Sequence, residues 1–146
     1  MYNVKRVLTC LAVVASGFAV APAGAVAPTA ELKNFVCQTS RDPASRQISI
    51  TAVMRPRQGT QRMELKFELL RRTSGRFLRV RARGLDTWIH PSPPDLGQRS
   101  GDVWNFAKPV LDLPAPAVYR LRVIFRWELA TTHIDTVLYS PSCAQS

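Results

Sequence analysis

Arginine is the residue type that gives this sequence its clearest chemical potential, the binding of anions. Ten basic side chains fall between residues 55 and 83, against two acidic ones, Glu64 and Glu68. A guanidinium group presents a planar fork of N–H donors that matches phosphate and carboxylate oxygens. The run therefore predicts a surface that attracts polyanions, such as cell-wall polymers, anionic lipids or nucleic acid. The candidate anion-binding residues are Arg71, Arg72, Arg76, Arg79, Arg81, Arg120 and Arg122.

The same charge has a second interpretation that the residues leave open. Charged side chains also keep exposed sheet edges from pairing with other chains. Arginine supplies 16 of the 20 basic residues, which is equally what a GC-rich genome produces. Among polyanions, nucleic acid is the least favoured partner, because the sequence carries no recognised nucleic-acid-binding motif and begins with an export signal.

Residue types that serve catalysis or metal binding are few and scattered. The two histidines, His90 and His133, have no nucleophile at a defined spacing, and no G-x-S-x-G motif occurs. We therefore predict no catalytic residue, no metal and no other cofactor. The turn aspartates follow no calcium-loop spacing and more often bond their own backbone. They are Asp86, Asp95, Asp102 and Asp112.

Aromatic residues flank a Pro- and Gly-rich segment in the middle of the chain. Trp88, His90 and Trp104 surround a loop predicted over residues 91–101, and such residues can line a groove for a peptide or a sugar. Packing in the core is the alternative use of a tryptophan. Long loops in compact domains are often functional, so a second hypothesis is a small secreted hydrolase or inhibitor that uses this loop.

The clearest structural element is Tyr119–Glu128, with the sequence YRLRVIFRWE. Apolar and basic side chains alternate along it, which predicts an antiparallel strand with one face in a core and one face in water. Residues 63–70 alternate in the same way but consist of good helix formers, so strand and helix both remain possible, with strand favoured. Arg71–Gly75 then forms a hairpin turn.

Shorter strands complete the pattern. We expect them at residues 33–38, 47–55, 77–82, 87–90, 103–106, 110–113 and 133–140, with Pro109 separating the two that surround it. Seven or eight short strands joined by turns predict an all-β, immunoglobulin-like antiparallel β-sandwich. Tyr119, at the start of a late strand, stands where a tyrosine corner occurs in such sandwiches. A small β-barrel is the alternative architecture.

The N-terminal residues predict export from the cell. Residues 1–25 resemble a signal peptide with cleavage after Ala25, residues 26–31 form a lead, and residues 32–146 form one domain. An uncleaved anchor is the alternative; no later segment could span a bilayer. Without residues 1–25, 18 basic and 10 acidic residues remain, hence a formal charge of +8. We expect a secreted protein that is retained at the cell surface or released.

Two cysteines, Cys37 and Cys143, remain near the ends of the mature chain. An even count in an exported domain predicts one disulfide. It closes a loop of about 105 residues and stabilises the fold by about 4–5 kcal/mol in the chain-entropy model. A pair of free thiols with a metal or redox role is the alternative, although no C-x-x-C spacing supports it.

Three segments carry a resemblance to known proteins: TWIHPSPPDLGQ, the block from Gly101 to Leu129, and the ending YSPSCAQ. They resemble small exported proteins of high-GC Gram-positive bacteria, with later strands similar to CARDB and fibronectin type III sandwiches. The resemblance covers residues 84–146 and implies a secreted sandwich without catalytic residues. Together with the charge, it favours an envelope-associated binding module for an anionic polymer or a protein partner.

Overall fold

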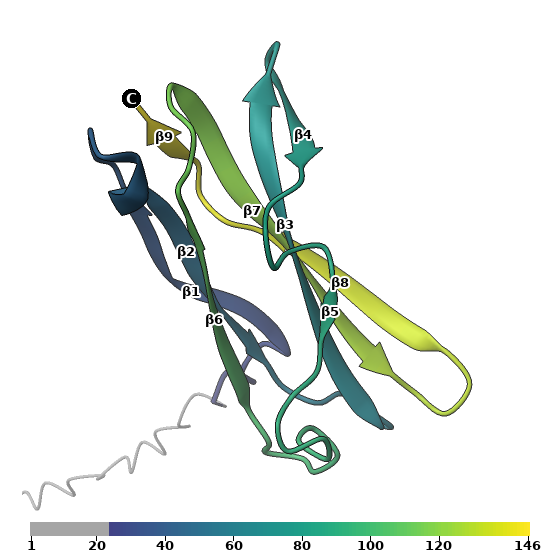
Figure 1. The fold of residues 1–146 in the computed structure, drawn as a ribbon. Helices are drawn as coiled ribbons and strands as arrows, with labels where there is room; N and C mark the ends of the chain where they lie inside the picture. The colour runs from purple at the N-terminus through teal and green to yellow at the C-terminus, as the bar shows by residue number, and fades with distance from the viewer. Residues whose placement is uncertain (1–23) are drawn as a thin grey trace, which may run out of the picture.

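The structure is a computed structural model that describes residues 24–146. Two antiparallel β-sheets face each other as the layers of a sandwich (Figure 1). The predicted all-β sandwich is therefore confirmed, and the two separate sheets exclude a closed barrel. The strands are β1 (Ala30–Gln38), β2 (Gln47–Met54), β3 (Arg62–Thr73), β4 (Arg76–Val80), β5 (Trp88–Ile89), β6 (Trp104–Leu111), β7 (Ala117–Glu128), β8 (His133–Tyr139) and β9 (Cys143–Gln145), with a short 3₁₀ helix, η1 (Pro43–Ser45).

The smaller sheet consists of three strands in the order β1-β2-β6. Strand β6 pairs with β2 without interruption from Gln47↔Leu111 to Met54↔Trp104. The prediction of two short strands separated by Pro109 was wrong. Pro109 pairs opposite Ser49 inside β6, and an edge strand tolerates a proline because one of its sides needs no hydrogen bonds.

The larger sheet is organised around β3 and β7, which pair over ten positions from Arg62↔Glu128 to Arg71↔Tyr119. Strands β4 and β5 pair with the edge of β3 that faces away from β7. Strands β8 and β9 pair with the edge of β7 that faces away from β3. Residues 63–70 are thus a strand, as favoured from their alternation. Strand β3 continues to Thr73, so the hairpin turn is confined to Ser74 and Gly75.

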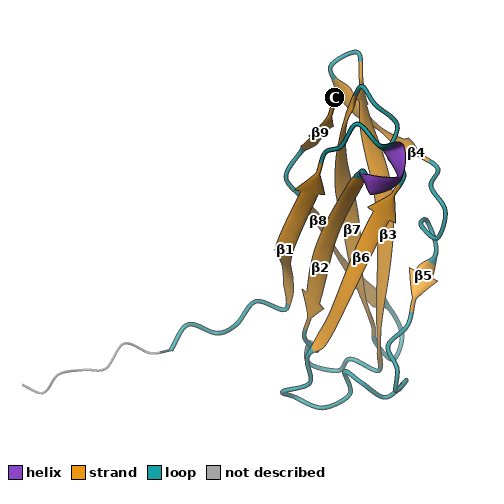
Figure 2. Ribbon diagram, turned by 60° about the vertical axis from the view of Figure 1, so that its left-hand side comes forward, coloured by secondary structure: helices purple, strands orange, loops and turns teal. Residues whose placement is uncertain are grey.

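The core lies between the two sheets (Figure 2). It contains the inward residues of β7 and of β3, alternating with charged residues on the outer face. Burial of this apolar surface is the main favourable term in folding. The largest fully buried side chains are Trp127, Tyr119, Phe67 and Phe125.

Two links hold the chain ends and the late loop in place. Cys37 and Cys143 form the predicted disulfide, with 5.4 Å between their Cα atoms. The hydroxyl of Tyr119 donates a hydrogen bond of 2.9 Å to the backbone carbonyl of Pro114. This is the hydrogen bond of a tyrosine corner, as predicted at that position. Burial raises the pKa of Tyr119, so its hydroxyl keeps the proton that it donates.

Residues 1–23 of the predicted signal peptide lie outside the described residues, so that assignment stays a prediction. Within the described part, no helix is long and apolar enough to cross a membrane.

The sandwich has two ends, formed by turns and loops, and two sides, formed by the edges of the sheets (Figure 1). The hairpin end carries the β3–β4 turn and the loop before β7. The loop end carries residues 55–61, 90–103 and 129–132. One side is closed by the disulfide between β1 and β9. On the opposite side, β6 and β4 face each other without pairing.

Candidate functional site

The outer face of the larger sheet is built by the register of β3 and β7. Because side chains alternate along both strands, directly paired residues share a face. The outward pairs include Glu64↔Arg126 and Glu68↔Arg122, so acidic residues of β3 stand opposite arginines of β7. Towards the hairpin end, the next pair is Leu70↔Arg120, where no carboxylate is present.

Glu68 is the centre of the paired part of this face. Its side chain is 3 % exposed, and Arg122 Nη1 lies 2.7 Å from Glu68 Oε2. Two further cations approach the other carboxylate oxygen, Arg79 at 3.6 Å and Lys66 at 3.8 Å. The hydrogen bond to Glu68 raises the pKa of Arg122. These cations therefore neutralise a buried carboxylate, and their charge is only partly available to a ligand.

A second paired cluster lies towards the loop end. Arg126 binds Asp135 through two hydrogen bonds, Nε to Oδ1 at 2.8 Å and Nη2 to Oδ2 at 2.7 Å. This fork raises the pKa of Arg126 and lowers the pKa of Asp135. Trp88 lies on the same face, with Arg126 Cζ at 4.2 Å and Lys66 Nζ at 4.7 Å from the centre of its ring. Cation and aromatic contacts here stabilise the sheet.

Arginines at the hairpin end have aromatic neighbours in place of carboxylates. Arg120 Cζ lies 4.2 Å from the ring centre of Phe77 and 4.5 Å from that of Tyr139. Arg72 Cζ lies 5.0 Å from Phe77. Within residues 24–146, none of four arginines around the hairpin forms an ion pair. These hairpin-end arginines are Arg71, Arg72, Arg76 and Arg120.

The predicted anion-binding residues are thus divided among three places. Arg79 and Arg122 share Glu68 on the outer face, whereas Arg72 and Arg120 lie on the same face without a carboxylate. Arg76 follows the tight turn at the tip. Two others, Arg71 and Arg81, line a hollow between the sheets on the unpaired side.

The structure does not bring together the three residues of the predicted groove, Trp88, His90 and Trp104. Trp104 is 6 % exposed and packs in the core, with its ring centre 6.0 Å from that of Phe106. Trp104 belongs to the smaller sheet and faces inwards, while Trp88 lies on the outer face of the larger sheet. His90 stays near Trp88, and its Nδ1 is 3.5 Å from the buried carboxylate of Glu64.

The predicted loop at residues 91–101 is present and is organised by Asp102. Its Oδ2 accepts hydrogen bonds from the backbone N–H groups of Gly97 at 2.8 Å and Arg99 at 3.2 Å. These bonds, that of Gly97 foremost, lower the pKa of Asp102. Of the turn aspartates, this one bonds its own backbone, as expected for the type.

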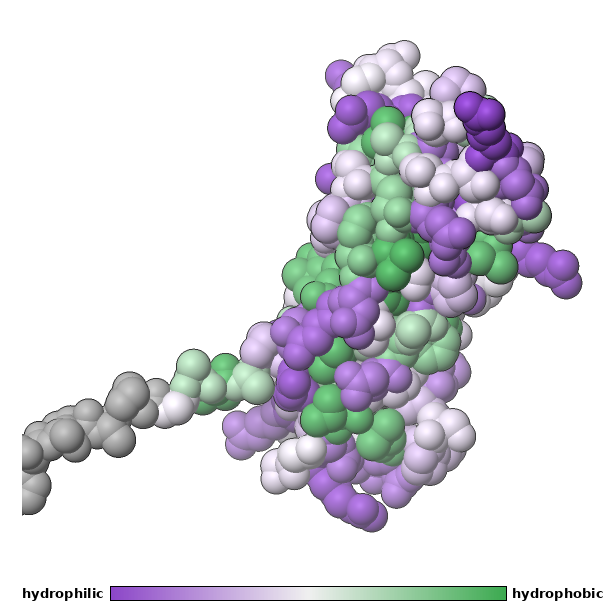
Figure 3. Space-filling model, turned by 90° about the vertical axis from the view of Figure 1, so that its left-hand side faces the viewer, coloured by the Kyte–Doolittle hydropathy of each residue, from purple (hydrophilic) through white to green (hydrophobic). Residues whose placement is uncertain are grey.

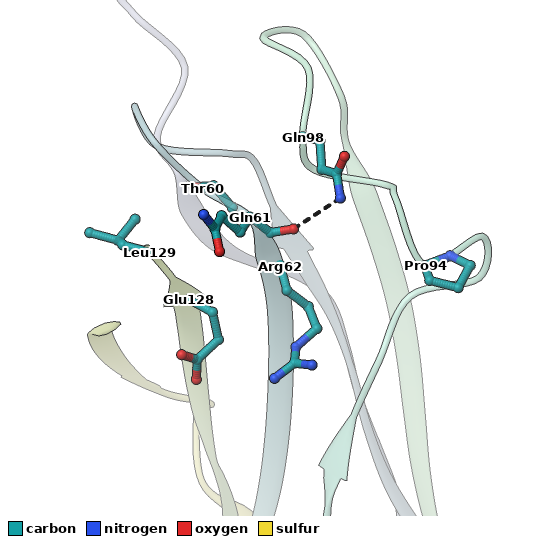
Figure 4. A pocket seen from close by; sticks show the side chains of 7 residues that line it. All are labelled: Thr60, Gln61, Arg62, Pro94, Gln98, Glu128 and Leu129. Atoms are coloured by element: carbon teal, nitrogen blue, oxygen red, sulfur yellow. Dashed lines mark hydrogen bonds between the residues drawn. The ribbon is translucent and has the colours of Figure 1, made fainter. Parts of the chain in front are cut away.

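A hollow of about 710 Å³ lies beside this loop (Figure 4). Arg62 and Glu128 come to it from the paired strands β3 and β7, and Pro94 and Gln98 come from the loop. Gln98 Nε2 donates a hydrogen bond of 3.2 Å to the backbone carbonyl of Gln61, which ties the loop to the start of β3. A hydrolase or inhibitor that uses this loop stays a prediction.

The outer face of the smaller sheet differs in kind. Along β2, Gln47, Ser49 and Thr51 alternate with buried residues and point outwards. Opposite them on β6 stand Leu111, Pro109 and Ala107. Figure 3 views the molecule from this side, and green and white atoms form a band in its upper half. These outward positions of β2 and β6 are therefore uncharged, unlike the outward Glu–Arg pairs of β3 and β7.

The sequence predicted charged residues on the outer face but not which side chains meet there. Lys66 and Arg126 hold Trp88, Phe77 and Tyr139 hold Arg120, and Glu68 collects three cations. The available signal was the alternation of β3 and β7, which places each residue on the outer face. The missing information was the register that decides which residues meet.

His133 and Asp135 approach to 4.0 Å at the loop end of β8. In the described part of the chain, no group of three or more His, Cys, Asp or Glu side chains is placed to hold a metal ion.

Comparison with known proteins gives no assignment. No protein-family model, no curated protein and no solved structure matches this chain. The resemblance to exported immunoglobulin-like proteins of Gram-positive bacteria therefore stays a prediction. What the chain shows by its own geometry is a disulfide-linked antiparallel sandwich with unpaired arginines at one end.

Proposed function

We propose that this protein is a secreted, non-catalytic binding module of the cell envelope that holds an anionic polymer at its hairpin end. The observation that carries the proposal is the unequal pairing of the arginines. Those in the middle of the outer face bind carboxylates of the same sheet, while Arg71, Arg72 and Arg76 pair with none among residues 24–146. Export is supported by the signal-like residues 1–25 and by the disulfide.

The hairpin end suits a polymer because three exposed charges surround a single turn. Arg71, Arg72 and Arg76 are all exposed and lie around one tight turn at Ser74 and Gly75. A polymer that carries one phosphate or carboxylate per unit can meet several of them together. Binding then releases counterions from the polymer, so the affinity falls steeply as salt rises.

The test is binding to a defined polyanion across a salt series. The disulfide-bonded protein is titrated with a poly(glycerol phosphate) of defined length, from about 20 to 300 mM NaCl, a range over which a surface charge effect changes strongly. We expect R71S/R72S/R76S to lower the affinity at least tenfold at low salt and to flatten the salt dependence.

The matched control removes the same charge from arginines and lysines that already have partners. The variant K33S/R62S/R99S loses three cations that lie near Glu31, Glu64 and Asp95, respectively. It should retain most of the affinity of the wild type. Equal losses in both triple variants would show a general charge effect, and no binding by the wild type at low salt would overturn the proposal.

A further inference from the structure

The unpaired side of the sandwich contains a groove that is independent of the outer face. It has a volume of about 440 Å³, within the range of small-ligand sites. We call it the open-side groove. It lies between β6 with the loop after it and the end of β4 with the segment that follows. Apolar and aromatic side chains line it: Leu69, Val80, Ala82, Val110, Leu113 and Tyr119. Charged side chains lie at its rim: Arg71, Arg81, Arg83 and Asp112.

The groove exists because the two sheets separate here. Strand β4 ends at Val80, and the next strand on that side, β5, begins only at Trp88. Strand β6 pairs with β2 alone, so no strand joins the layers on this side. Leu69 and Leu113, each at most 3 % exposed, therefore line the apolar bottom of the groove between the sheets.

The rim of the groove is cationic. Arg71, Arg81 and Arg83 outnumber Asp112, and none of the three arginines forms an ion pair with another residue of the described chain. A smaller hollow of about 320 Å³ shares Ala82, Arg83 and Val110 with the groove and extends it along β6. An apolar floor under unpaired guanidinium groups matches a ligand with an apolar chain and an acidic head.

An added peptide strand fits this side less well. Strand β6 is the exposed edge, and Pro109 in its middle has no N–H to donate to a new neighbour. An amphiphile needs no backbone hydrogen bonds from the edge, because its chain is held by apolar contact and its head by charge-assisted hydrogen bonds.

We infer that the open-side groove binds a single-chain anionic amphiphile. The apolar chain lies on Leu69, Val110 and Leu113, and the carboxylate or phosphate head meets Arg81 and Arg83. This ligand is a different class from the anionic polymer proposed above, and the inference does not depend on that proposal.

The test compares ligands that share one half of this chemistry. Sodium decanoate and decyl phosphate, both below their micelle-forming concentrations, are titrated into the disulfide-bonded protein by calorimetry. Acetate supplies the head alone, and decanol supplies the chain alone. We expect binding of decanoate or decyl phosphate at least tenfold tighter than that of acetate and of decanol. Comparable binding of acetate, or of decanol, would overturn the inference.

Two variants locate the site. A82W fills the groove without changing charge, and R81S/R83S removes the charge without filling it. Each should weaken decanoate binding at least tenfold, and the methyl NMR signals of Leu69, Val110 and Leu113 should shift on binding to the wild type. An unchanged affinity in R81S/R83S, or shifts confined to other methyl groups, would overturn the inference even if A82W fails to fold.

A variant of each site separates the two proposals. A82W should bind the poly(glycerol phosphate) as the wild type does, because the hairpin-end arginines are untouched. R72S/R76S, which leaves the groove residue Arg71 in place, should weaken polymer binding but bind decanoate as tightly as the wild type does.

Discussion

The two ends of the larger sheet use the same residue type in different ways. Towards the loop end, Arg122 and Arg126 are held by Glu68 and Asp135 at hydrogen-bond distance. Towards the hairpin end, Arg120 contacts the rings of Phe77 and Tyr139 and pairs with no carboxylate of the described part of the chain. All three arginines alternate along β7, so their local sequence is alike. The difference teaches that the cross-strand neighbour decides whether the charge of an arginine is neutralised by a carboxylate or stays unneutralised.

The largest effect should come from removing the carboxylate at the centre of the paired part. E68Q removes the counter-charge of Arg122 and Lys66, and one of the two carboxylates near Arg79, on a face where Glu68 is 3 % exposed. We expect the free energy of unfolding to fall by about 2–3 kcal/mol, measured by urea denaturation at pH 7.

The control for that variant is E31Q, which removes a carboxylate from the more exposed pair with Lys33. It should change stability by less than about 0.5 kcal/mol. If E68Q and E31Q lowered the free energy of unfolding equally, Glu68 would not stabilise the paired end of the sheet more than an exposed ion pair does.

The stack at Arg120 should have the next largest effect. R120M keeps an apolar stem between Phe77 and Tyr139 but removes the charge that faces both rings. Two cation–π contacts predict a loss of about 1 kcal/mol in the free energy of unfolding. R76M, at an exposed site beside the turn, is the control and should be close to neutral. A stability of R120M equal to wild type would assign Arg120 to binding alone.

The Arg126–Asp135 ion pair should make the free energy of unfolding depend on pH. Arg126 lowers the pKa of Asp135 in the folded protein, so the folded state binds this proton less readily than the unfolded state. The fork therefore stabilises above the unfolded pKa near 3.9, and this contribution is lost as the pH falls from there through the folded pKa. We expect it to amount to about 1 kcal/mol.

The measurement is urea denaturation at pH 7 and at pH 3 for wild type and D135N. The variant should be less stable at pH 7, and the gap between the two proteins should shrink at pH 3. A gap that stays constant would show that the carboxylate of Asp135 does not carry the effect.

The smallest effect on stability is expected at the exposed arginines beside the hairpin turn. R72S and R76S remove exposed arginines that form no ion pair with the residues described by the structure. Each should change the free energy of unfolding by less than about 0.5 kcal/mol. Both should nevertheless weaken binding of the polyanion. A large loss of stability in R76S would mean that this arginine has a structural role, and the comparison between the two ends would fail.

Local pattern was sufficient for much of the fold. The alternation from Tyr119 to Glu128 indicated a half-buried strand, and β7 is one. The alternation of residues 63–70 outweighed their helix-forming composition, because β3 packs its apolar side on a shared core. Pro109 misled the interpretation, since a proline breaks a central strand but not the free side of an edge strand.

The candidate site was only partly visible in the sequence. The arginines themselves could be found by composition, but their division into paired and unpaired sets could not. Trp88 and Trp104 lie near one another in the chain, yet one lies on the outer face of the larger sheet and the other in the core. Proximity along the chain says little about position across a sandwich, because consecutive strands can belong to opposite layers.

What the sequence by itself determined is the class of structure and its covalent link. Alternation with a period of two, frequent turns and two cysteines in an otherwise cysteine-free segment specify an antiparallel sandwich closed by one disulfide. These features are local or depend on composition, so they can be read without knowing which strands are neighbours.

Only the tertiary structure decided which charges are neutralised and where a groove opens. The Glu68–Arg122 contact joins residues 54 positions apart, and the open-side groove joins Val80 to Val110 across two sheets. Both depend on strand order and register, which the whole core selects at once. A shift of one residue in the β3–β7 pairing would place every outward arginine opposite a different neighbour.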